Sequence, residues 1–517
     1  MTTTFDATTI ESDMHMKRGG VIVVNPGGRD QIYQSLGNEL TAIEPPLWVR
    51  LISGYLLDRQ VPLSILDTEA EGLGAGRAAQ SIVSSDPDLV IVVAFGHQPS
   101  ASTQTMVGAS ALIDEIKLAS PDTPVLLVGG HVSALPSETL DKTQADYVCQ
   151  GEGTLTSYEL WQTLQDECEL EAVRGLVRRS NDGVVFNPKA PISEDLDADL
   201  HGNVWHLLPM EKYRAHNWQC FGELETRQPY ASIYTTLGCP YKCVFCCINA
   251  PFDSNRYRTR SPEHVVAEVK YLYETYGVKT FKIIDEMFVL KKRHYVTICE
   301  GLAALPFVKE LNIWAYARVD TVKDETLPLL RKAGIRWLAL GIESGSEVVR
   351  DGAEKSFSQD DIRSIVKSIQ DAGINVMGNF IFGLPDDDQE AMQATLDLAL
   401  ELQCEFINFY SAMAYPGSQL YVQAKQHGWQ LPETWSGFSQ HSYDCLPLRT
   451  NHISAKEVLA FRDEAFHRYF DHQPYLAFVE QKFGAETRQH IQDMACTRLS
   501  RKLIDDAAKA IPAVEKS

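Results

Sequence analysis

The sequence predicts an α/β protein with two consecutive domains of strand–helix repeats and a mainly helical C-terminal segment. Short, continuously apolar runs, typical of buried parallel strands, alternate with stretches of helical periodicity, first over residues 20–160 and again over 231–430. A cysteine-rich loop stands at the start of the second series. We therefore expect a doubly wound, Rossmann-like domain at 20–160, a linker at 161–230, a second repeat domain at 231–430 and helices at 431–517, after a disordered tail at 1–19.

Length and composition exclude several classes of protein. The chain has 517 residues, enough for two or three domains, and its 47 basic against 69 acidic residues give a net charge of −22. No basic stripe supports a nucleic-acid partner. The longest apolar run, Leu89–Phe95, is too short to span a membrane. The 11 cysteines are mostly scattered singly, which argues against a disulfide framework and for a cytoplasmic protein.

The first series of repeats supplies five strands and the helices between them. Helical periodicity is clear at Leu47–Leu57 and Thr105–Ala119. In a doubly wound sheet, ligands bind at the carboxyl ends of the strands. The predicted strands are Val21–Val24, Leu63–Leu66, Leu89–Ala94, Val125–Val128 and Tyr147–Cys149.

Glycine-rich turns follow several of these strands. Because glycine has no Cβ, its backbone can approach a bound ligand closely, although a tight turn alone would also select glycine. The sequence therefore predicts a ligand site at this edge of the sheet. The candidate residues are Asn25, Gly27, Gly96, Gly129, Gly130, His131, Gly151, Glu152 and Gly153.

The remaining elements follow from local signals. Leu176–Phe186 predicts a hairpin around the Asn181-Asp182-Gly183 turn. A helix is expected from Pro262, with Ser261 as its N-cap, and C-terminal helices at Ala455–Tyr469 and Thr487–Leu499. The second series of strands comprises Ser232–Thr235, Lys282–Ile284, Ile313–Ala317, Trp337–Ile342, Val376–Ile381 and Phe406–Ser411.

Three cysteines lie in one short loop after the first strand of the second series. Cys239, Cys243 and Cys246 form a C-x3-C-x2-C triplet. Thiolates are the ligands that iron–sulfur clusters prefer, and three of them leave one iron of a four-iron cube open. A structural zinc loop would need further cysteine or histidine ligands at suitable spacing, and none follows. Cys247 directly adjoins Cys246, so we do not expect it to be a ligand.

The triplet, with Phe245 just before its last cysteine, resembles the radical S-adenosylmethionine (SAM) superfamily. The string VGGHVSALPSETL…ADYVCQGEG resembles the cobalamin-binding domain of its class B members, and the resemblance covers about 20–430. It implies that the second domain is a partial (β/α)6 barrel and that Cys239, Cys243 and Cys246 hold a 4Fe-4S cluster. The open iron would then bind the amino and carboxylate groups of SAM.

The resemblance also implies which residues bind the other cofactors. Cobalamin would lie at the glycine-rich turns of the first domain. In the string Asp67–Gly72, Glu69 stands where many cobalamin domains place a cobalt-binding histidine, which is compatible with a cobalt that lacks this ligand or with a domain that has lost cobalamin. The residues expected at SAM, mostly at strand ends of the barrel, are Phe245, Asp285, Glu286, Arg318, Glu343, Ser344, Gly383 and Pro385.

The activity implied is that of a cobalamin-dependent radical SAM methyltransferase. Such an enzyme methylates an unactivated carbon of a small-molecule or biosynthetic substrate through a 5′-deoxyadenosyl radical and methylcobalamin, with a flavodoxin- or ferredoxin-type reductant. A cyclisation or rearrangement, as in the anaerobic cyclase of bacteriochlorophyll synthesis, remains an alternative. A methylthiotransferase without cobalamin is less favoured, because only Cys149 and Cys168 precede residue 200. The sequence indicates neither a catalytic residue nor the substrate.

Overall fold

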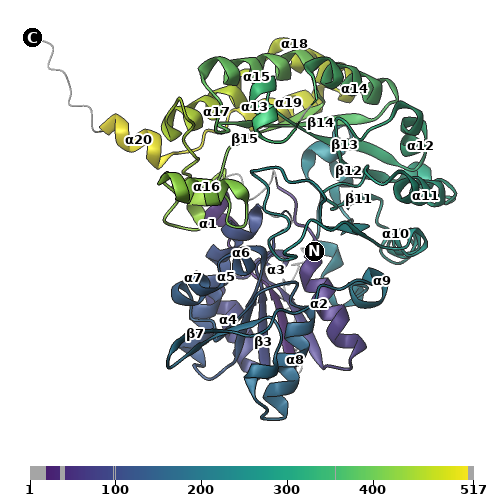
Figure 1. Ribbon diagram of the computed structural model, residues 1–517. Helices are drawn as coiled ribbons and strands as arrows, with labels where there is room; N and C mark the ends of the chain where they lie inside the picture. The colour runs from purple at the N-terminus through teal and green to yellow at the C-terminus, as the bar shows by residue number, and fades with distance from the viewer. Residues whose placement is uncertain (1–18, 35–40, 97, 99, 356, 510–517) are drawn as a thin grey trace, which may run out of the picture.

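The computed structural model of the chain describes residues 19–34, 41–96, 98, 100–355 and 357–509. The predicted disordered tail therefore lies outside the described residues, apart from its last position. Two bodies are visible, each built around a parallel sheet, with the first sheet below the second (Figure 1). None of the described helices combines the length and apolarity that a bilayer-spanning segment needs.

The first sheet has seven strands in the order β2-β1-β3-β4-β5-β6-β7. Strands β1 to β5 are parallel, and β6 and β7 extend the sheet in antiparallel fashion. The predicted hairpin thus forms, but it adds two strands to this sheet instead of lying within a linker. The strands are β1 (Val21–Asn25), β2 (Leu63–Asp67), β3 (Leu89–Val93), β4 (Val125–Val128), β5 (Tyr147–Cys149), β6 (Leu176–Ser180) and β7 (Gly183–Phe186).

Helices cover both faces of this sheet, which explains its continuously apolar strands. Val21 and Val23 face a core with α2, whereas Ile22 and Val24 face a core with α4 and α5. The doubly wound prediction is confirmed. The helices are α1 (Arg29–Tyr33), α2 (Leu47–Asp58), α3 (Thr68–Glu71), α4 (Ala75–Ser84), α5 (Ala101–Ala119), α6 (Gly130–Ala134), α7 (Pro136–Lys142), α8 (Thr154–Gln165) and the 3-10 turn η2 (Leu170–Ala172).

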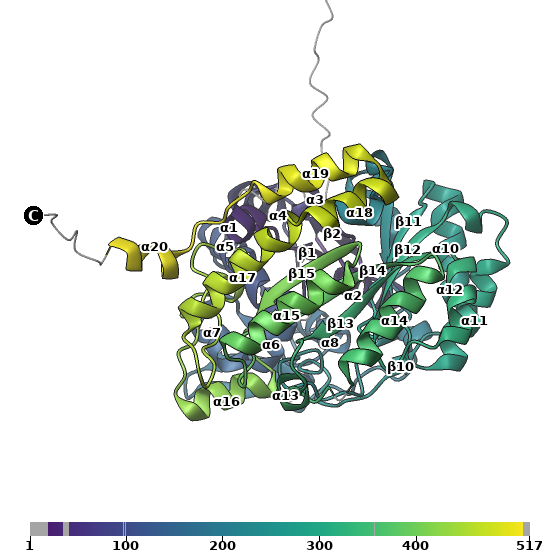
Figure 2. The same ribbon diagram turned by 90° about the horizontal axis from the view of Figure 1, so that it is seen from above.

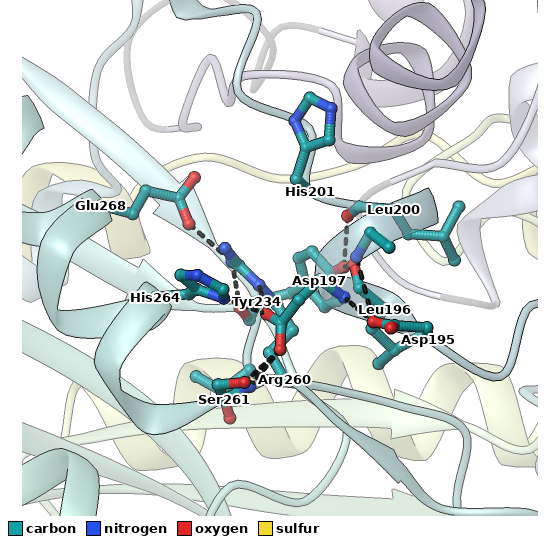
Figure 3. A network of polar contacts seen from close by, with 12 residues as sticks. Asp195, Leu196, Asp197, Leu200, His201, Tyr234, Arg260, Ser261, His264 and Glu268 are labelled. Carbon is teal, nitrogen blue, oxygen red and sulfur yellow. Dashed lines mark hydrogen bonds and ion pairs between the residues drawn. The ribbon is translucent and has the colours of Figure 1, made fainter. Parts of the chain in front are cut away.

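The connection between the sheets is fastened to the second domain by a short helix, α9 (Leu196–Asp199). Asp197 accepts hydrogen bonds from the backbone and the hydroxyl of Ser261, and the Tyr234 hydroxyl donates to the Leu200 carbonyl (Figure 3). Ser261 therefore occupies the predicted N-cap position, but its side chain does not cap the helix. The connection continues through η3 (Trp205–Leu207), η4 (Met210–Lys212), η5 (Asn217–Cys220) and η6 (Leu224–Arg227).

The second sheet contains six parallel strands in the order β15-β14-β13-β12-β11-β8. It confirms the expected partial barrel, with α11, α12, α14 and α15 along its outer side (Figure 1). A two-stranded ribbon, β9 (Thr236–Leu237) and β10 (Arg258–Thr259), closes the cysteine loop. The strands are β8 (Tyr230–Ile233), β11 (Thr280–Ile283), β12 (Asn312–Arg318), β13 (Ile335–Glu343), β14 (Asn375–Phe382) and β15 (Phe406–Ser411).

The helices of the barrel follow its strands in sequence. They are α10 (Pro262–Tyr276), α11 (Lys292–Ala303), α12 (Leu327–Lys332), α13 (Glu347–Gly352), α14 (Gln359–Asp371), α15 (Gln389–Leu402) and α16 (Gln419–His427). Short 3-10 turns lie at η7 (Val308–Glu310), η8 (Asp324–Thr326) and η9 (Ser436–Phe438).

C-terminal helices pack beside the last barrel strand, as Figure 2 shows for α17 and β15. The Arg462 guanidinium of α17 donates to the Phe409 carbonyl at 2.8 Å. The helix expected to reach Leu499 ends at Ala495, because the chain leaves it to place Arg501 against Asp463 at 2.8 Å. The helices are α17 (Ala455–Phe470), α18 (Gln473–Phe483), α19 (Ala485–Ala495) and α20 (Lys502–Lys509).

Buried ion pairs join the N-terminal part of the chain to the barrel. Glu268 of α10, which belongs to one of these pairs, accepts further hydrogen bonds from Arg260 at 2.6 Å and from the Trp205 indole at 3.0 Å. Its carboxylate is therefore fully engaged. Buried charges of this kind are costly to separate. The pairs therefore hold the two bodies in one arrangement. They are Arg50–Glu268 at 3.3 Å, Glu44–Lys282 at 2.9 Å and Glu152–Arg258 at 2.6 Å.

Candidate active site between the two sheets

A cavity lies between the two bodies. The first domain contributes the turns after β3 and β4 and the start of α2. The barrel contributes the cysteine loop and the residues after β11. Motifs predicted independently for two different cofactors therefore face the same space between the domains.

Aromatic side chains form the wall on the first-domain side. Trp48 stacks on Phe95 with ring centroids 4.2 Å apart, and both line the cavity. His131 lies beside them, with Nδ1 at 3.2 Å from the Thr103 hydroxyl. Burial lowers the pKa of His131 to about 4, so this imidazole is neutral at physiological pH. The wall thus combines an aromatic surface with uncharged polar groups, as is typical of a site for an organic ligand.

The nine residues predicted to contact cobalamin have different surroundings. Gly96, Gly130 and His131 line the cavity. Gly129 and Gly153 allow tight packing, since a Cβ on either would lie 2.4 Å from Ala94 or Val128. The other four lie elsewhere: Asn25 donates to Asp67, Gly27 packs against Gly108, Gly151 donates to Ser133, and Glu152 pairs with Arg258.

The cysteine loop is held by backbone geometry and by one asparagine. Gly238 has φ of +82°, and a Cβ there would lie 2.1 Å from the Arg256 carbonyl oxygen, so only glycine fits. Asn249 donates to the Cys239 carbonyl at 3.0 Å, and the Cys246 amide donates to the Cys243 carbonyl at 3.0 Å. These bonds fold the loop back on itself and bring its thiols to the carboxyl end of the barrel.

The thiols of the loop fit an iron–sulfur cluster chemically. Burial raises the pKa of Cys239 to about 11 and that of Cys246 well above its usual value, so both are protonated until a metal displaces the proton. Among the residues described, no three His, Cys, Asp or Glu side chains converge on one metal ion. A cube makes no such demand, because each of its cysteines binds a different iron. Cys247 instead lines the interdomain cavity.

Two acidic residues follow β11 and have different partners. Asp285 is buried and accepts hydrogen bonds from the backbone amides of Thr235 and Thr236, at 2.6 and 3.0 Å, and from the Thr235 hydroxyl. Its carboxylate therefore fastens the start of the cysteine loop. Glu286 lines the cavity, and burial raises its pKa to about 7, with Asp285 adding to the shift against the opposing effect of Lys282. Of the two, Glu286 is the better placed to meet a ligand amine.

Arg318 lies at the end of β12, against the cysteine loop. Its guanidinium lies 3.9 Å from the Tyr241 ring centroid and pairs with Asp320 at 2.9 Å. One further N–H points at the Cys243 sulfur, 3.7 Å away. Arg318, which is expected at SAM, thus also contacts a predicted cluster ligand.

The end of β13 carries a buried ion pair. Glu343 has φ of +67°, a left-handed conformation that is uncommon outside glycine and is often found at functional sites. Its carboxylate pairs with Lys355, whose ammonium also lies 5.9 Å from the Phe245 ring centroid. Ser344, also expected at SAM, is fully buried and bonds Thr395 at 3.1 Å.

The loop after β14 is ordered by another carboxylate. Asp387 accepts hydrogen bonds from the Gly383 and Leu384 amides at 2.8 and 3.1 Å. A Cβ on Gly383 would lie 2.4 Å from Val458 of α17, so this glycine permits a close helix contact. Pro385 stays partly exposed, with its carbonyl accepting from Asn451 at 2.9 Å. The C-terminal helices thus support the strand-end loops.

Several residues at the site carry no signal in the sequence. Lys355, Trp48 and Gln98 line the cavity or contact the predicted SAM residues, and Gln98 donates to the Tyr316 hydroxyl across the two domains. Each belongs to a helix or loop without a motif, and the partners of Trp48 and Gln98 lie far away in the chain. Long-range pairing of this kind has no characteristic spacing.

Comparison with known proteins assigns both halves of this site. Residues 233–399 match the radical SAM superfamily, and residues 33–160 match the B12 binding domain. An uncharacterized methyltransferase of Pyrococcus horikoshii is 26% identical over 461 residues, 88% of this chain and 93% of that protein. The anaerobic magnesium-protoporphyrin IX monomethyl ester cyclase of Rubrivivax gelatinosus is 26% identical over 90% of this chain and 80% of its own length.

Solved structures share the whole architecture. The radical SAM methyltransferase TsrM from Kitasatospora setae, with cobalamin and a [4Fe-4S] cluster bound, superposes with a TM-score of 0.66 over 93% of this chain and 99% of that chain, at 19% identity. The cobalamin-dependent radical SAM enzyme OxsB has a TM-score of 0.65 over 93% of this chain and 72% of that chain, at 15% identity. The chain therefore contains a radical SAM domain and an N-terminal B12-binding domain, and these two family matches imply a 4Fe-4S cluster, SAM and cobalamin as its cofactors.

Proposed function

We propose that this protein is a cobalamin-dependent radical SAM methyltransferase that acts on an unactivated carbon of a small-molecule substrate. One observation carries the proposal: a single cavity joins the Gly130–His131 turn of the B12-binding domain to Cys247 and Glu286 beside the cluster loop. A methyl group can pass between cofactors only if both reach one enclosed space. Relatives named as methyltransferases support the same reading.

The proposed cluster ligands are Cys239, Cys243 and Cys246, and the cofactors would supply radical formation and a transferable methyl group. The protein's own residues position these groups and exclude water. Glu286 would accept a hydrogen bond from SAM's amino group. Arg318 and Lys355 lie beside aromatic rings of the loop, and either could meet its carboxylate. Trp48 and Phe95 would provide an apolar face for the corrin ring.

The surroundings of the site favour certain partners. The reaction needs a one-electron donor, for which a flavodoxin or ferredoxin is the natural chemical class. All eleven cysteines lie within the described residues and are free thiols, which fits a reducing, cytoplasmic location.

Asn379 and Asn408 lie on the barrel strands, where Asn408 donates to Asn379 at 3.1 Å. Their partly exposed amides would help to orient a polar substrate.

A cyclisation or rearrangement is the second candidate, because the cyclase of Rubrivivax gelatinosus is a relative over most of this chain. The two candidates use the same cofactors but differ in the fate of SAM's methyl group. A methyltransferase consumes it, whereas a cyclase does not. The test therefore follows that group.

The reconstituted protein would be incubated without oxygen with cobalamin, a chemical reductant and SAM carrying a trideuterated methyl group. The proposal predicts 5′-deoxyadenosine and transfer of the trideuteriomethyl group to cobalamin, both measured by mass spectrometry. Deoxyadenosine without labelled cobalamin would favour the cyclase candidate. Absence of deoxyadenosine from a protein that holds its iron would contradict radical SAM chemistry altogether.

A further inference from the structure

Arg318 makes a direct contact with a predicted cluster ligand. Its side chain is 7% exposed, and its Nη1 lies 3.7 Å from the Cys243 Sγ, within hydrogen-bonding distance for sulfur. Cys243 is the middle cysteine of the triplet. A cationic donor therefore points at one sulfur of the cluster site from the end of the neighbouring strand.

Two further contacts fix the orientation of this guanidinium. Asp320 accepts from Nε at 2.9 Å and from Nη2 at 3.1 Å, in the two-point geometry typical of arginine and carboxylate. The Tyr241 ring, two residues before Cys243, lies against the flat face with its centroid 3.9 Å away. The loop and the strand thus hold Arg318 together, and neither contact depends on SAM.

Arginine has enough donors for a second task. Of its five N–H groups, two bond Asp320 and one points at Cys243, which leaves two for another acceptor. A contact with SAM and the contact with sulfur can therefore coexist. The sulfur contact is the one that the geometry already contains.

We propose that Arg318 is a positioning residue that donates a hydrogen bond to the Cys243 thiolate of the cluster and raises the cluster's reduction potential. This inference rests on the proposed function, because it requires a cluster on the triplet. Reduction adds negative charge to the cluster. A hydrogen bond to sulfur and a nearby positive charge stabilise the reduced form more than the oxidised form.

Asp320 provides an internal check on this inference. Its carboxylate lies on the other side of the guanidinium and partly neutralises it. Removing the negative charge of Asp320 while keeping Arg318 would expose the cluster to a stronger positive field. The two residues should therefore shift the reduction potential in opposite directions, which a merely structural role for the pair would not do.

The experiment is a redox titration of the reconstituted protein without SAM, monitored by electron paramagnetic resonance. Four variants are compared with the wild type: Arg318→Gln, Arg318→Lys, Asp320→Asn and, as a control, Arg336→Gln. Arg336 lies near the start of β13, at the opposite end of the barrel, where it donates to the Leu311 and Lys309 carbonyls. Its substitution removes the same charge far from the loop.

We expect Arg318→Gln to lower the midpoint potential and Asp320→Asn to raise it. Arg318→Lys should give an intermediate value, because the charge remains but the planar fork is lost. Arg336→Gln should match the wild type. Unchanged potentials in both Arg318→Gln and Asp320→Asn, or shifts in the same direction, would overturn the inference.

Iron content separates this inference from the proposed function. If the wild type takes up no cluster, the proposed function fails, and the inference fails with it. If the wild type takes up iron but Arg318→Gln does not, the midpoint potential of Asp320→Asn alone tests the inference. A raised potential in that variant supports the inference, and an unchanged or lowered one contradicts it.

Discussion

Asp285, two residues after β11, fastens Thr235, two residues after β8, through both the backbone amide at 2.6 Å and the hydroxyl. The same carboxylate accepts from the Thr236 amide at 3.0 Å. These bonds lie four residues before the first predicted cluster cysteine. The carboxylate thus links the position of the cysteine loop to the neighbouring strand.

Asp285→Asn should loosen the cysteine loop. The amide keeps one acceptor oxygen but replaces the other with a donor that faces the buried Thr235 hydroxyl, at a cost of about 1–3 kcal/mol. We expect less iron per chain after reconstitution and a lower urea midpoint. Glu286→Gln is the matched control, because it changes the adjacent acid, which makes no such bonds to the loop. Equal iron loss in both variants would refute the assignment of Asp285.

The triplet and Cys247 should behave differently on substitution. The triple variant Cys239→Ala, Cys243→Ala, Cys246→Ala should lose the cluster and keep cobalamin, because the two sites lie on different domains. Cys247→Ala should keep the cluster, since its thiol lines the interdomain cavity. Iron content and the broad iron–sulfur absorbance measure both outcomes. A Cys247→Ala protein without cluster absorbance would show that this cysteine is a ligand.

Glu268→Gln should destabilise the contact between the domains. Arg50 and Arg260 both bond this buried carboxylate. Without it Arg50 loses its carboxylate partner, and Arg260 keeps only the pair with Asp197 at 3.7 Å. Breaking such a buried pair costs about 3–5 kcal/mol in free energy of unfolding. Asp371→Asn is the control, because Asp371 pairs with Lys367 on the surface and should contribute about 0–1 kcal/mol. Urea unfolding measures both, and similar losses would argue against the interdomain role of Glu268.

The raised pKa of the buried Asp387 carboxyl predicts that the stability of the protein depends on pH. Burial raises its pKa from 3.8 to about 7, and its Oδ1 is buried without a hydrogen-bond partner. The folded state therefore holds a proton that the unfolded chain has lost over this range, so the contribution of Asp387 to stability falls as pH rises from about 4 to about 7. Asp387→Asn does not titrate. Its stability relative to the wild type should rise over that range, by about 1.4 kcal/mol per unit of pKa difference.

The measurement is the difference in free energy of unfolding between Asp387→Asn and the wild type, at several pH values across that range. The sign is the discriminating feature, because a carboxylate with a lowered pKa would make the difference fall with pH. A difference that stays constant with pH would mean that Asp387 is ionised in the folded protein.

The architecture was predictable because burial on both faces of a sheet requires apolar residues at successive positions of each strand. In β1, Val21 and Val23 enter one core and Ile22 and Val24 the other, so every position is apolar. The cysteine triplet could be recognised because its three cysteines lie within eight residues of one another. Both features involve residues that are close together in the chain, so they can be recognised in a single sequence.

The contacts that build the site between domains were not predictable in the same way. Glu152 lies between two glycines and suggests a ligand contact, yet it pairs with Arg258, which is 106 residues away. Arg50 and Glu268 are 218 residues apart, and no spacing connects them. Ser344 follows the expected strand but is buried against Thr395. Which strand-end residues face the cavity depends on how the two domains pack against each other. The hydrophobic periodicity of the sequence gives no information about that packing.

The most direct test of this account is the metal content of the full-length protein. The protein would be purified without oxygen, reconstituted with iron, sulfide and cobalamin, and freed of unbound cofactor before iron and cobalt are measured. About four irons and about one cobalt per chain are expected if the cluster loop and the B12-binding domain face one cavity as two cofactor sites. Iron without cobalt would contradict the two-cofactor methyltransferase, because the proposed methyl carrier would have no place in the protein.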